Sequence, residues 1–211
     1  MSLAETLWRE NEDLARAALD HRFVRSLADG TLPLKNFQDY VAQDAFYLES
    51  FVRAYALALA NSPDARGLHD FAALLTGALE ELKLHEDYAA RWNVDLSGTV
   101  PVGATLAYTD FLLATASLGT VGEICAAMTP CMRLYAFLGQ SLSEEGISGD
   151  NPHAEWIETY SDPEFEALAA RLEELLDRYA DDSPAVREIY RRAMTLEVGF
   201  FEANSPEKER L

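Results

Sequence analysis

The residues best suited to chemistry begin with a thiol that directly follows a proline. In residues 125–135, CAAMTPCMRLY, Pro130 lies within a helical pattern, Cys131 follows it, and Tyr135 comes one turn later. Proline cannot donate to the carbonyl four residues earlier, so we expect a kink that re-aims the next side chain. A cysteine is a nucleophile where the local field lowers its pKa, and otherwise it packs. We interpret Cys125 as a packing residue, and both interpretations of Cys131 stay open from this stretch alone.

Two carboxylates lie in apolar helical patterns. Asp44 precedes Tyr47 by three residues on one helix face, where a buried carboxylate needs a hydrogen bond or a ligand. Glu197 shares a face with Phe200 and Phe201, and a carboxyl group among aromatic rings has a raised pKa suited to a general acid or base. The alternative for each carboxylate is a solvated helix face, and for Asp44 also a structural hydrogen bond.

Further polar groups complete the set. Tyr108 and Tyr160 lie in apolar surroundings, where a phenol can stack on a flat ligand or serve as an ordinary core residue. Glu81 and His85 have the i, i+4 spacing of a metal pair, but a di-iron bundle would use Glu-x-x-His motifs. None of the four histidines has a glutamate three positions earlier, as that motif requires. We therefore interpret Glu81 and His85 as a charged pair on a helix and predict no metal site.

These groups suit substitution on a planar heterocycle better than peptide or phosphate chemistry. They provide a nucleophile, an acid, an anchoring carboxylate and stacking rings. We expect them to converge on one enclosed cavity between helices, sized for a small aromatic base.

The elements that must position these residues are helices. Almost every segment has an apolar period near 3.6, which predicts an all-α bundle of seven or eight helices in a single domain, residues 1–211. The expected helices cover 3–20, 34–61, 64–92, 104–116, a stretch from 121, 152–160, 163–180 and a stretch from 184, with a loop over about 20–33. Thr120 with Glu123 predicts a capping box, and Ser183 before Pro184 predicts a helix start.

Composition narrows the class of partner. The net charge is −19, from 36 acidic against 17 basic residues, which disfavours binding to nucleic acid or to an anionic membrane. There is no apolar run of 18 residues and no signal peptide, so we expect a cytoplasmic protein. Cys125 and Cys131 would be separated by about 9 Å of helical rise, beyond normal disulfide reach, and we expect free thiols.

A resemblance to a known family adds to this interpretation. The chain resembles the TenA/thiaminase II family of aminopyrimidine aminohydrolases over nearly its whole length. The resemblance rests on D-G-T-L-P at 29–33, Q-D-x-x-Y-L at 43–48 and P-C-x-x-L-Y at 130–135. It continues in the stretches 84–95, 153–165 and 197–201. It implies a haem-oxygenase-like all-α fold and usually a tetramer, with no metal or organic cofactor.

The resemblance also implies an activity. Such enzymes hydrolyse 4-amino-5-aminomethyl-2-methylpyrimidine to the 5-hydroxymethyl pyrimidine and ammonia in thiamin pyrimidine salvage, and many also cleave thiamin. Cys131 matches the nucleophile and Glu197 the acid/base, with Glu202 as a rival for the acid role. Asp44 matches the carboxylate that binds the ring nitrogen and amino group. The positions that match rings stacking on or hydrogen-bonding to the pyrimidine are Tyr47, Tyr108, Tyr135 and Tyr160.

Two alternatives come from other classes. The same architecture hosts haem oxygenases, a quinone-forming oxidase and di-iron proteins, so fold alone does not name the function, and His21 would be a candidate haem ligand. A non-catalytic pyrimidine or thiamin binder, or a regulator, is the second alternative. Cys131 together with Glu197 favours turnover, because binding alone needs neither residue.

Overall fold

The described chain is helical throughout. The computed structural model describes residues 1–92, 96–147 and 149–206, apart from the side chains of 84–88, 92 and 97. Within those ranges there is no strand, which confirms the all-α prediction, and no helix is long and apolar enough to cross a membrane. The elements are α1 (Leu3–Glu10), α2 (Glu12–Leu19), α3 (Arg22–Ala28), α4 (Leu34–Ala60), α5 (Ala65–Trp92), η1 (Leu96–Gly98), α6 (Gly103–Leu118), α7 (Val121–Glu145), α8 (Ala154–Ser161), α9 (Pro163–Tyr179) and α10 (Pro184–Ala203).

The helix count exceeds the predicted seven or eight for local reasons at the N-terminal end. The expected helix over 3–20 is two helices, because Asn11 ends α1 and begins α2. The Asn11 amide group donates to the Leu7 carbonyl at 2.8 Å, so this side chain satisfies a helix-end acceptor. The expected loop over 20–33 contains α3, whose first turn is capped by His21. Polar side chains at helix ends thus divide α1 from α2 and begin α3, which the apolar period alone did not predict.

The predicted caps of the two helices that carry Cys131 and Glu197 are confirmed. Thr120 accepts from the Glu123 N–H while the Glu123 carboxylate accepts from the Thr120 N–H, which is the capping box of α7. Ser183 caps α10, and Pro184 is its first residue. Pro130 lies in the interior of α7, which continues as an α-helix to Glu145, and the kink at this position stays a prediction.

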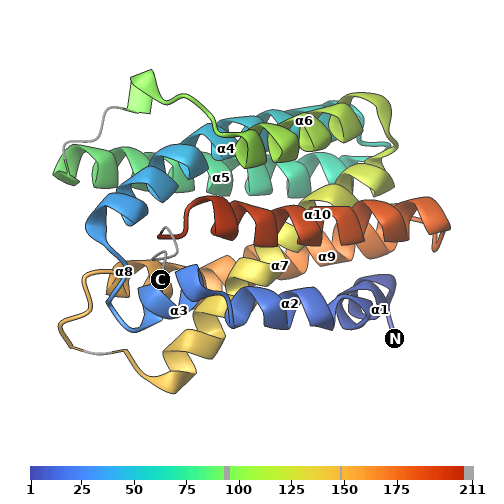
Figure 1. Cartoon of the computed structure of the whole chain (residues 1–211). Coiled ribbons are helices and arrows are strands. Elements are labelled where there is room, and N and C mark those ends of the chain that lie inside the picture. The colour runs from blue at the N-terminus through green and yellow to red at the C-terminus, as the bar shows by residue number, and fades with distance from the viewer. Residues whose placement is uncertain (93–95, 148, 207–211) are drawn as a thin grey trace.

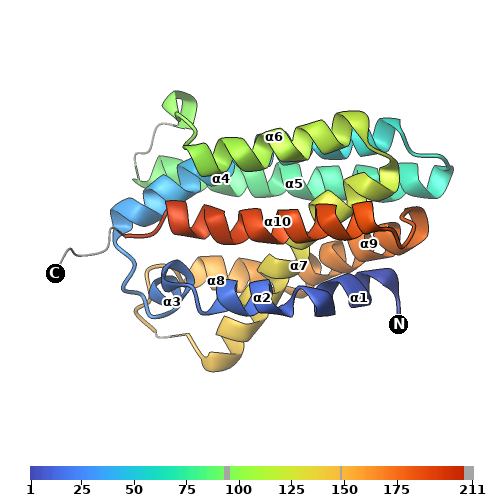
Figure 2. The ribbon, with the colours of Figure 1, turned by 45° about the vertical axis from the view of Figure 1, so that its right-hand side comes forward.

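Helix α7 is the central element of the bundle. It packs against α4, α6, α8, α9 and α10, and it crosses between the layer formed by α4, α5 and α6 and the layer that contains α1, α2 and α9 (Figures 1 and 2). Since successive helical residues point about 100° apart, one stretch of α7 can serve several neighbours at once. Residues near Cys131 therefore reach both layers.

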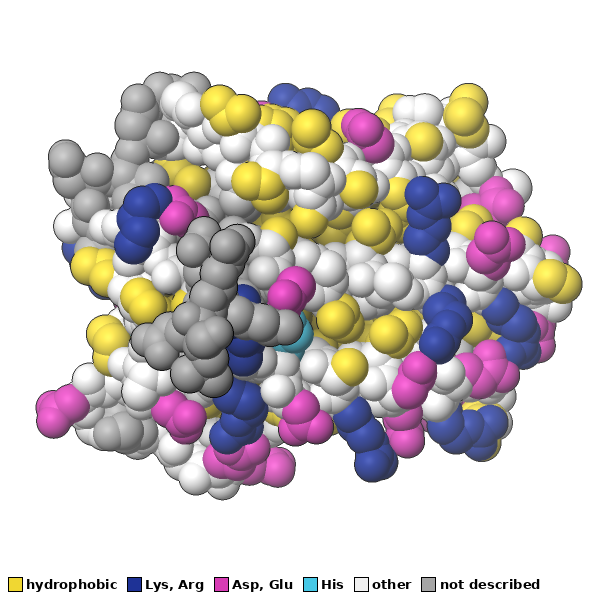
Figure 3. All heavy atoms as spheres, in the orientation of Figure 1, with side chains coloured by type: hydrophobic (Ala, Val, Ile, Leu, Met, Phe, Trp, Pro, Cys, Tyr) yellow, Lys and Arg dark blue, Asp and Glu magenta, His cyan; other side chains and the backbone are white. Residues whose placement is uncertain are grey.

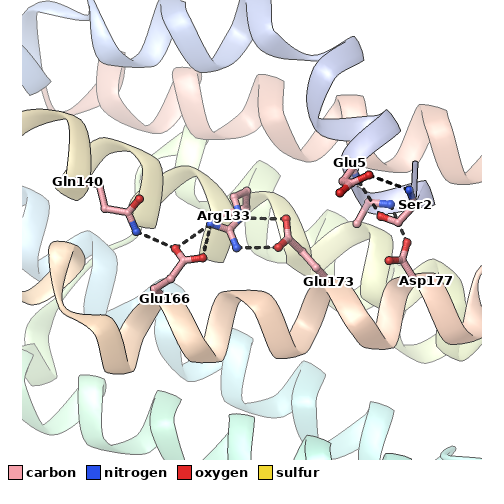
Figure 4. Close-up of polar contacts among 8 residues, drawn as sticks. Ser2, Glu5, Arg133, Gln140, Glu166, Glu173 and Asp177 are labelled. Atoms are coloured by element: carbon pink, nitrogen blue, oxygen red, sulfur yellow. Dashed lines mark hydrogen bonds and ion pairs between the residues drawn. The ribbon is translucent and has the colours of Figure 1, made fainter.

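A largely buried arginine ties α7 to α9. Arg133, two residues after Cys131, donates to both oxygens of Glu173 at 2.9 and 2.6 Å and to both oxygens of Glu166 at 2.9 and 2.8 Å (Figure 4). Gln140 donates to Glu166 at 2.7 Å. Burial opposes the charge on Arg133, but the two carboxylates outweigh it and raise the arginine pKa. A guanidinium that donates to both oxygens of a carboxylate fixes the orientation of the two groups as well as their distance. These bonds therefore set the register of α7 on α9.

Helix α8 approaches α7 closely at a glycine. A Cβ placed on Gly139 would lie 2.4 Å from the carbonyl carbon of Tyr160 and 2.6 Å from its oxygen. Both atoms belong to the backbone, so they cannot move aside as a flexible side chain can. The absence of a side chain at Gly139 therefore lets α8 bring Tyr160 against α7.

We predict that Gly139→Ala destabilises the fold by roughly 1–3 kcal/mol, because overpacking against backbone forces the two helices apart. Gly199→Ala is the matched control, since a Cβ there meets nothing within 4 Å. That change should stabilise α10 by up to about 1 kcal/mol through helix propensity. Urea denaturation of both variants measures the difference, and equal effects would contradict the close approach.

Candidate active site

The predicted site residues lie on five helices, α4, α6, α7, α8 and α10. On α4 the stripe consists of Tyr40, Asp44, Tyr47 and Phe51, all buried, at spacings of three or four residues. The corresponding stripe on α10 includes Glu197, whose side chain is only 2% exposed. Helical periodicity thus carries two carboxylates into the core together with apolar residues, because each occupies a position that the stripe assigns to the interior.

Most of these side chains line one internal cavity. It is bounded by Asp44, Tyr47, Glu81, Cys131, Tyr135 and Tyr160, among others. Glu197 and Tyr108 are not among the residues that line it, so the expected meeting of all the predicted residues at one enclosed space stays a prediction. The cavity is narrower than expected, however. Its volume of about 10 Å³ admits about one water molecule and no pyrimidine ring.

Glu197 and Tyr108 meet beside Cys131. The Tyr108 hydroxyl donates to Glu197 Oε1 at 2.6 Å in a buried contact, and the Tyr108 ring lies 4.6 Å from that of Tyr47. The Cys131 thiol acts on the pKa of Glu197 in the lowering direction, so the two side chains are neighbours. The rival carboxylate lies elsewhere: the Glu202 side chain is 56% exposed and pairs with His21 at 3.1 Å. Of the two glutamates, only Glu197 is placed to exchange a proton with the thiol.

The thiol and its neighbouring carboxylate both favour their neutral forms. Burial, followed by the negative charges of Glu197 and Glu81, holds the pKa of Cys131 well above its ordinary value. Burial also raises the pKa of Glu197 to about 8, against the opposing hydrogen bond from Tyr108. For a nucleophilic Cys131 the sequence predicts a pKa that the local field lowers. The buried, acidic surroundings of the thiol raise its pKa instead. Any attack by Cys131 must therefore be coupled to removal of its proton.

A set of aromatic rings forms another part of the wall. The Tyr135 ring lies 4.8 Å from that of Tyr160 and 5.6 Å from that of Trp156. The Tyr135 hydroxyl is 3.1 Å from the Tyr40 hydroxyl, which accepts from Trp156 Nε1 at 3.2 Å. Tyr40 and Trp156 were not among the predicted site residues. Their packing and hydrogen bonds fix the orientation of the two tyrosines that line the cavity.

The sequence did not predict that Glu81 would line the cavity. It lines the cavity and accepts from the Tyr160 hydroxyl at 2.6 Å. A signal for this was available, since Phe71, Leu74 and Ala78 form a buried stripe on α5 that Glu81 continues at helical spacing. The charged pair predicted with His85 lies outside the described residues, because the histidine side chain is among those not described.

The contacts of His21 do not support its role as a haem ligand. His21 Nδ1 accepts from the Phe23 N–H at 3.3 Å and Nε2 pairs with Glu202 at 3.1 Å, so both ring nitrogens have structural partners. In the described part of the chain, no three His, Cys, Asp or Glu side chains are grouped so that they could hold a metal ion.

Comparison with known proteins places the chain in a family. Residues 8–206 match the TENA/THI-4/PQQC family. The chain belongs to this family. Among its relatives, an aminopyrimidine aminohydrolase of Halalkalibacterium halodurans is 34% identical over 187 residues, covering 85% of this chain and 83% of the relative. The mitochondrial bifunctional TH2 protein of Arabidopsis thaliana is 36% identical over 207 residues, and the chain spans 34% of its length.

Solved structures of the family have the same architecture. A TenA homologue from Pyrococcus horikoshii superposes with a TM-score of 0.88 at 28% identity, covering 97% of this chain and 98% of that one. A domain from Shewanella denitrificans with a haem-oxygenase-like fold has a TM-score of 0.66 at 14% identity, covering 97% and 92% of the two chains. These likenesses confirm the predicted family and the haem-oxygenase-like fold.

The raised pKa of Glu197 predicts a pH-dependent loss of stability. The unfolded chain releases this proton near the ordinary glutamate pKa of 4.5, and the folded chain keeps it until about pH 8. Between these values the unfolded state binds fewer protons, so the free energy of unfolding falls as pH rises. Relative to Glu197→Gln, the wild-type protein should lose on the order of a few kcal/mol across this window.

Denaturant titrations of the two proteins at several pH values measure this difference. Glu202→Gln, which removes an exposed carboxylate from the same helix, controls for the general effect of lost charge. A stability difference between wild type and Glu197→Gln that does not change with pH would contradict the buried, neutral state of Glu197.

Proposed function

We propose that the protein is an aminopyrimidine aminohydrolase of thiamin pyrimidine salvage. It would convert 4-amino-5-aminomethyl-2-methylpyrimidine to the 5-hydroxymethyl pyrimidine and ammonia, and cleave thiamin at the same carbon. The observation that carries the proposal is that this family member has a cavity lined by Cys131, Asp44 and three tyrosines, with Glu197 next to the thiol. Relatives named aminopyrimidine aminohydrolase, 34% and 29% identical, support it.

The first step is addition of sulfur to the pyrimidine ring. The minor fraction of Glu197 that is ionised near neutral pH accepts the proton of Cys131 as the sulfur–carbon bond forms, and a ring nitrogen takes up the electron pair of the broken π bond. A thiol with a raised pKa needs such a base, and Glu197, with a pKa of about 8, is matched to this exchange near neutral pH. The influence of each side chain on the pKa of the other supports a direct exchange of the proton between them.

The second and third steps exchange the leaving group for water. The ammonium group of the bound substrate first loses a proton to solvent. The electron pair on the ring then returns and breaks the bond between the methylene carbon and nitrogen, and the amine leaves with the proton from Glu197. Water then adds to the methylene carbon and gives a proton to Glu197. Restoration of the aromatic ring expels the sulfur, which regains that proton. Glu197 thus acts as base, acid, base and acid in turn, and Tyr108 holds it in position at 2.6 Å.

Ring binding belongs to Asp44 and the tyrosines in this proposal. Asp44 would accept hydrogen bonds at the polar edge of the pyrimidine, and Tyr47, Tyr108, Tyr135 and Tyr160 would stack on the ring or hydrogen-bond to it. Because the cavity now admits about one water molecule, its lining must move apart when substrate enters. Met132 and Phe165 also line it and are apolar side chains that can rotate.

The setting of the enzyme follows from the surface and the thiols. Two free cysteines suit a reducing compartment, and we place the protein in the cytoplasm with a small-molecule substrate.

We also propose a homotetramer. Helix α6 is apolar on its buried side, with Leu112, and on its outer side, where Leu106 is 42% and Leu118 is 88% exposed. Hydrophobic side chains gather over this part of the surface (Figure 3), as expected of a helix covered by another copy.

We predict that Cys131→Ala lowers ammonia release from the aminomethylpyrimidine by at least about a thousandfold, because no other group can form the ring adduct. Cys125→Ala is the matched control: its thiol is fully buried on the same helix and should be dispensable for turnover. Glu197→Gln should also lose most of the activity. A wild-type protein that binds the pyrimidine but releases no ammonia would instead be the non-catalytic binder.

We predict that Leu106→Glu reduces the solution mass to that of a smaller species, because a charge at the covered face of α6 opposes burial. Size-exclusion chromatography with light scattering measures the mass. Leu68→Glu changes a similarly exposed leucine on α5 and should leave the assembly intact. A monomeric wild-type protein would contradict the proposed tetramer.

A further inference from the structure

A larger cleft beside the internal cavity has no part in the steps above. Its volume is about 570 Å³, within the range of about 300–1,000 Å³ that is usual for small-molecule sites. Its walls come from α5, α8 and α9, which contribute Leu74, Thr159 and Leu168 among others. Unlike the nearly closed inner cavity beside it, this cleft is large enough to hold part of a substrate.

The cleft and the cavity meet at three side chains. Glu81, Met132 and Phe165 line both spaces. Glu81 is partly buried, and the donated bond from the Tyr160 hydroxyl at 2.6 Å holds its carboxylate at this junction. A ring bound in the inner cavity with a substituent pointing outward would therefore pass its substituent beside Glu81.

The cleft has the charge of a cation site. Among the described charged residues that line it, Glu80, Glu81, Asp162 and Glu164 are acidic and Lys83 is basic. The apolar part of the lining, which includes Met132, would accommodate the flat faces of a heterocycle. An acidic, partly apolar cleft of this kind suits an organic cation better than an anion or a sugar.

A buried hydroxyl independently points to a ligand here. Tyr55 lines the cleft and is only 1% exposed, and no hydrogen-bond partner within the described residues reaches its hydroxyl. Tyr55 lines this cleft together with Glu81, Met132 and Phe165, the three residues of the junction. Buried polar groups nearly always have a partner, so an unpaired one beside a cleft is a group that a ligand can satisfy.

We propose that the cleft receives the group that leaves from the methylene carbon, and that Glu81 selects leaving groups that carry a positive charge. The inference rests on the proposed function and adds a specificity residue and a subsite to it. The leaving groups fit this chemistry. An alkyl amine is protonated at neutral pH, as lysine is, and the thiazolium of thiamin is a permanent cation. A carboxylate at the junction would attract either one before the carbon–nitrogen bond breaks.

Binding measurements on a protein that cannot turn over test the proposal. In a Cys131→Ser background, isothermal titration calorimetry at pH 7 would give the dissociation constants of three ligands that share one ring. They are the aminomethylpyrimidine, thiamin and the neutral hydroxymethylpyrimidine. Adding Glu81→Gln should weaken the two cationic ligands by roughly tenfold and the neutral one by less than about twofold. The glutamine keeps an oxygen that can accept from Tyr160.

Two further variants sharpen the result. Glu158→Gln removes an exposed carboxylate on α8 outside the cleft lining, and it should leave all three constants unchanged. Tyr55→Phe should weaken only thiamin, by roughly threefold, because only its second ring reaches the cleft. Equal weakening of all three ligands by Glu81→Gln, or no weakening of the cations, would overturn the proposal. Failure of the hydroxymethylpyrimidine to bind at all would instead overturn the proposed function.

Discussion

Burial of acidic groups around one thiol is the constraint on which the rest of the structure depends. A carboxylate in an apolar bundle is costly unless it is neutral or hydrogen-bonded. Glu197 meets this condition in two ways, since burial raises its pKa to about 8 and Tyr108 donates to it. Glu81 has a comparable donor in Tyr160. The tyrosines of the site are therefore hydrogen-bond donors to buried acids as well as rings for a flat ligand.

The same constraint gives the site its chemistry. Burial raises the pKa of both Cys131 and Glu197, and the charge of Glu197 raises that of the thiol further, so neither group ionises easily alone. A proton passed between them keeps the total charge of the pair constant while sulfur becomes nucleophilic. This differs from a thiolate stabilised by a positive field, and it makes the geometry of the pair more important than the resting pKa of the thiol.

Helix α7 converts this pair into a positioned site. Cys131, Met132 and Tyr135 point to the cavity, while Arg133 points to α9 and binds Glu166 and Glu173 there (Figure 4). Further along the helix, Gly139 admits the backbone of α8 and so brings Tyr160 to the wall. The fold alone does not determine this chemistry, because one architecture can host many unrelated activities.

The sequence by itself determined the helical class and the caps of α7 and α10, because these depend on local spacing and on side chains a few residues apart. It placed Asp44 and Glu197 in apolar helical patterns but left open whether they face inward. It did not separate α1 from α2 or reveal α3, since short helices joined at a polar cap share one apolar period. Only the tertiary structure decided that Glu81 faces the cavity, that Glu202 is exposed, and that the cavity is narrow beside a wide cleft. Those features depend on how helices distant in sequence pack, and the volume left between their side chains is a property of the whole bundle rather than of any one helix.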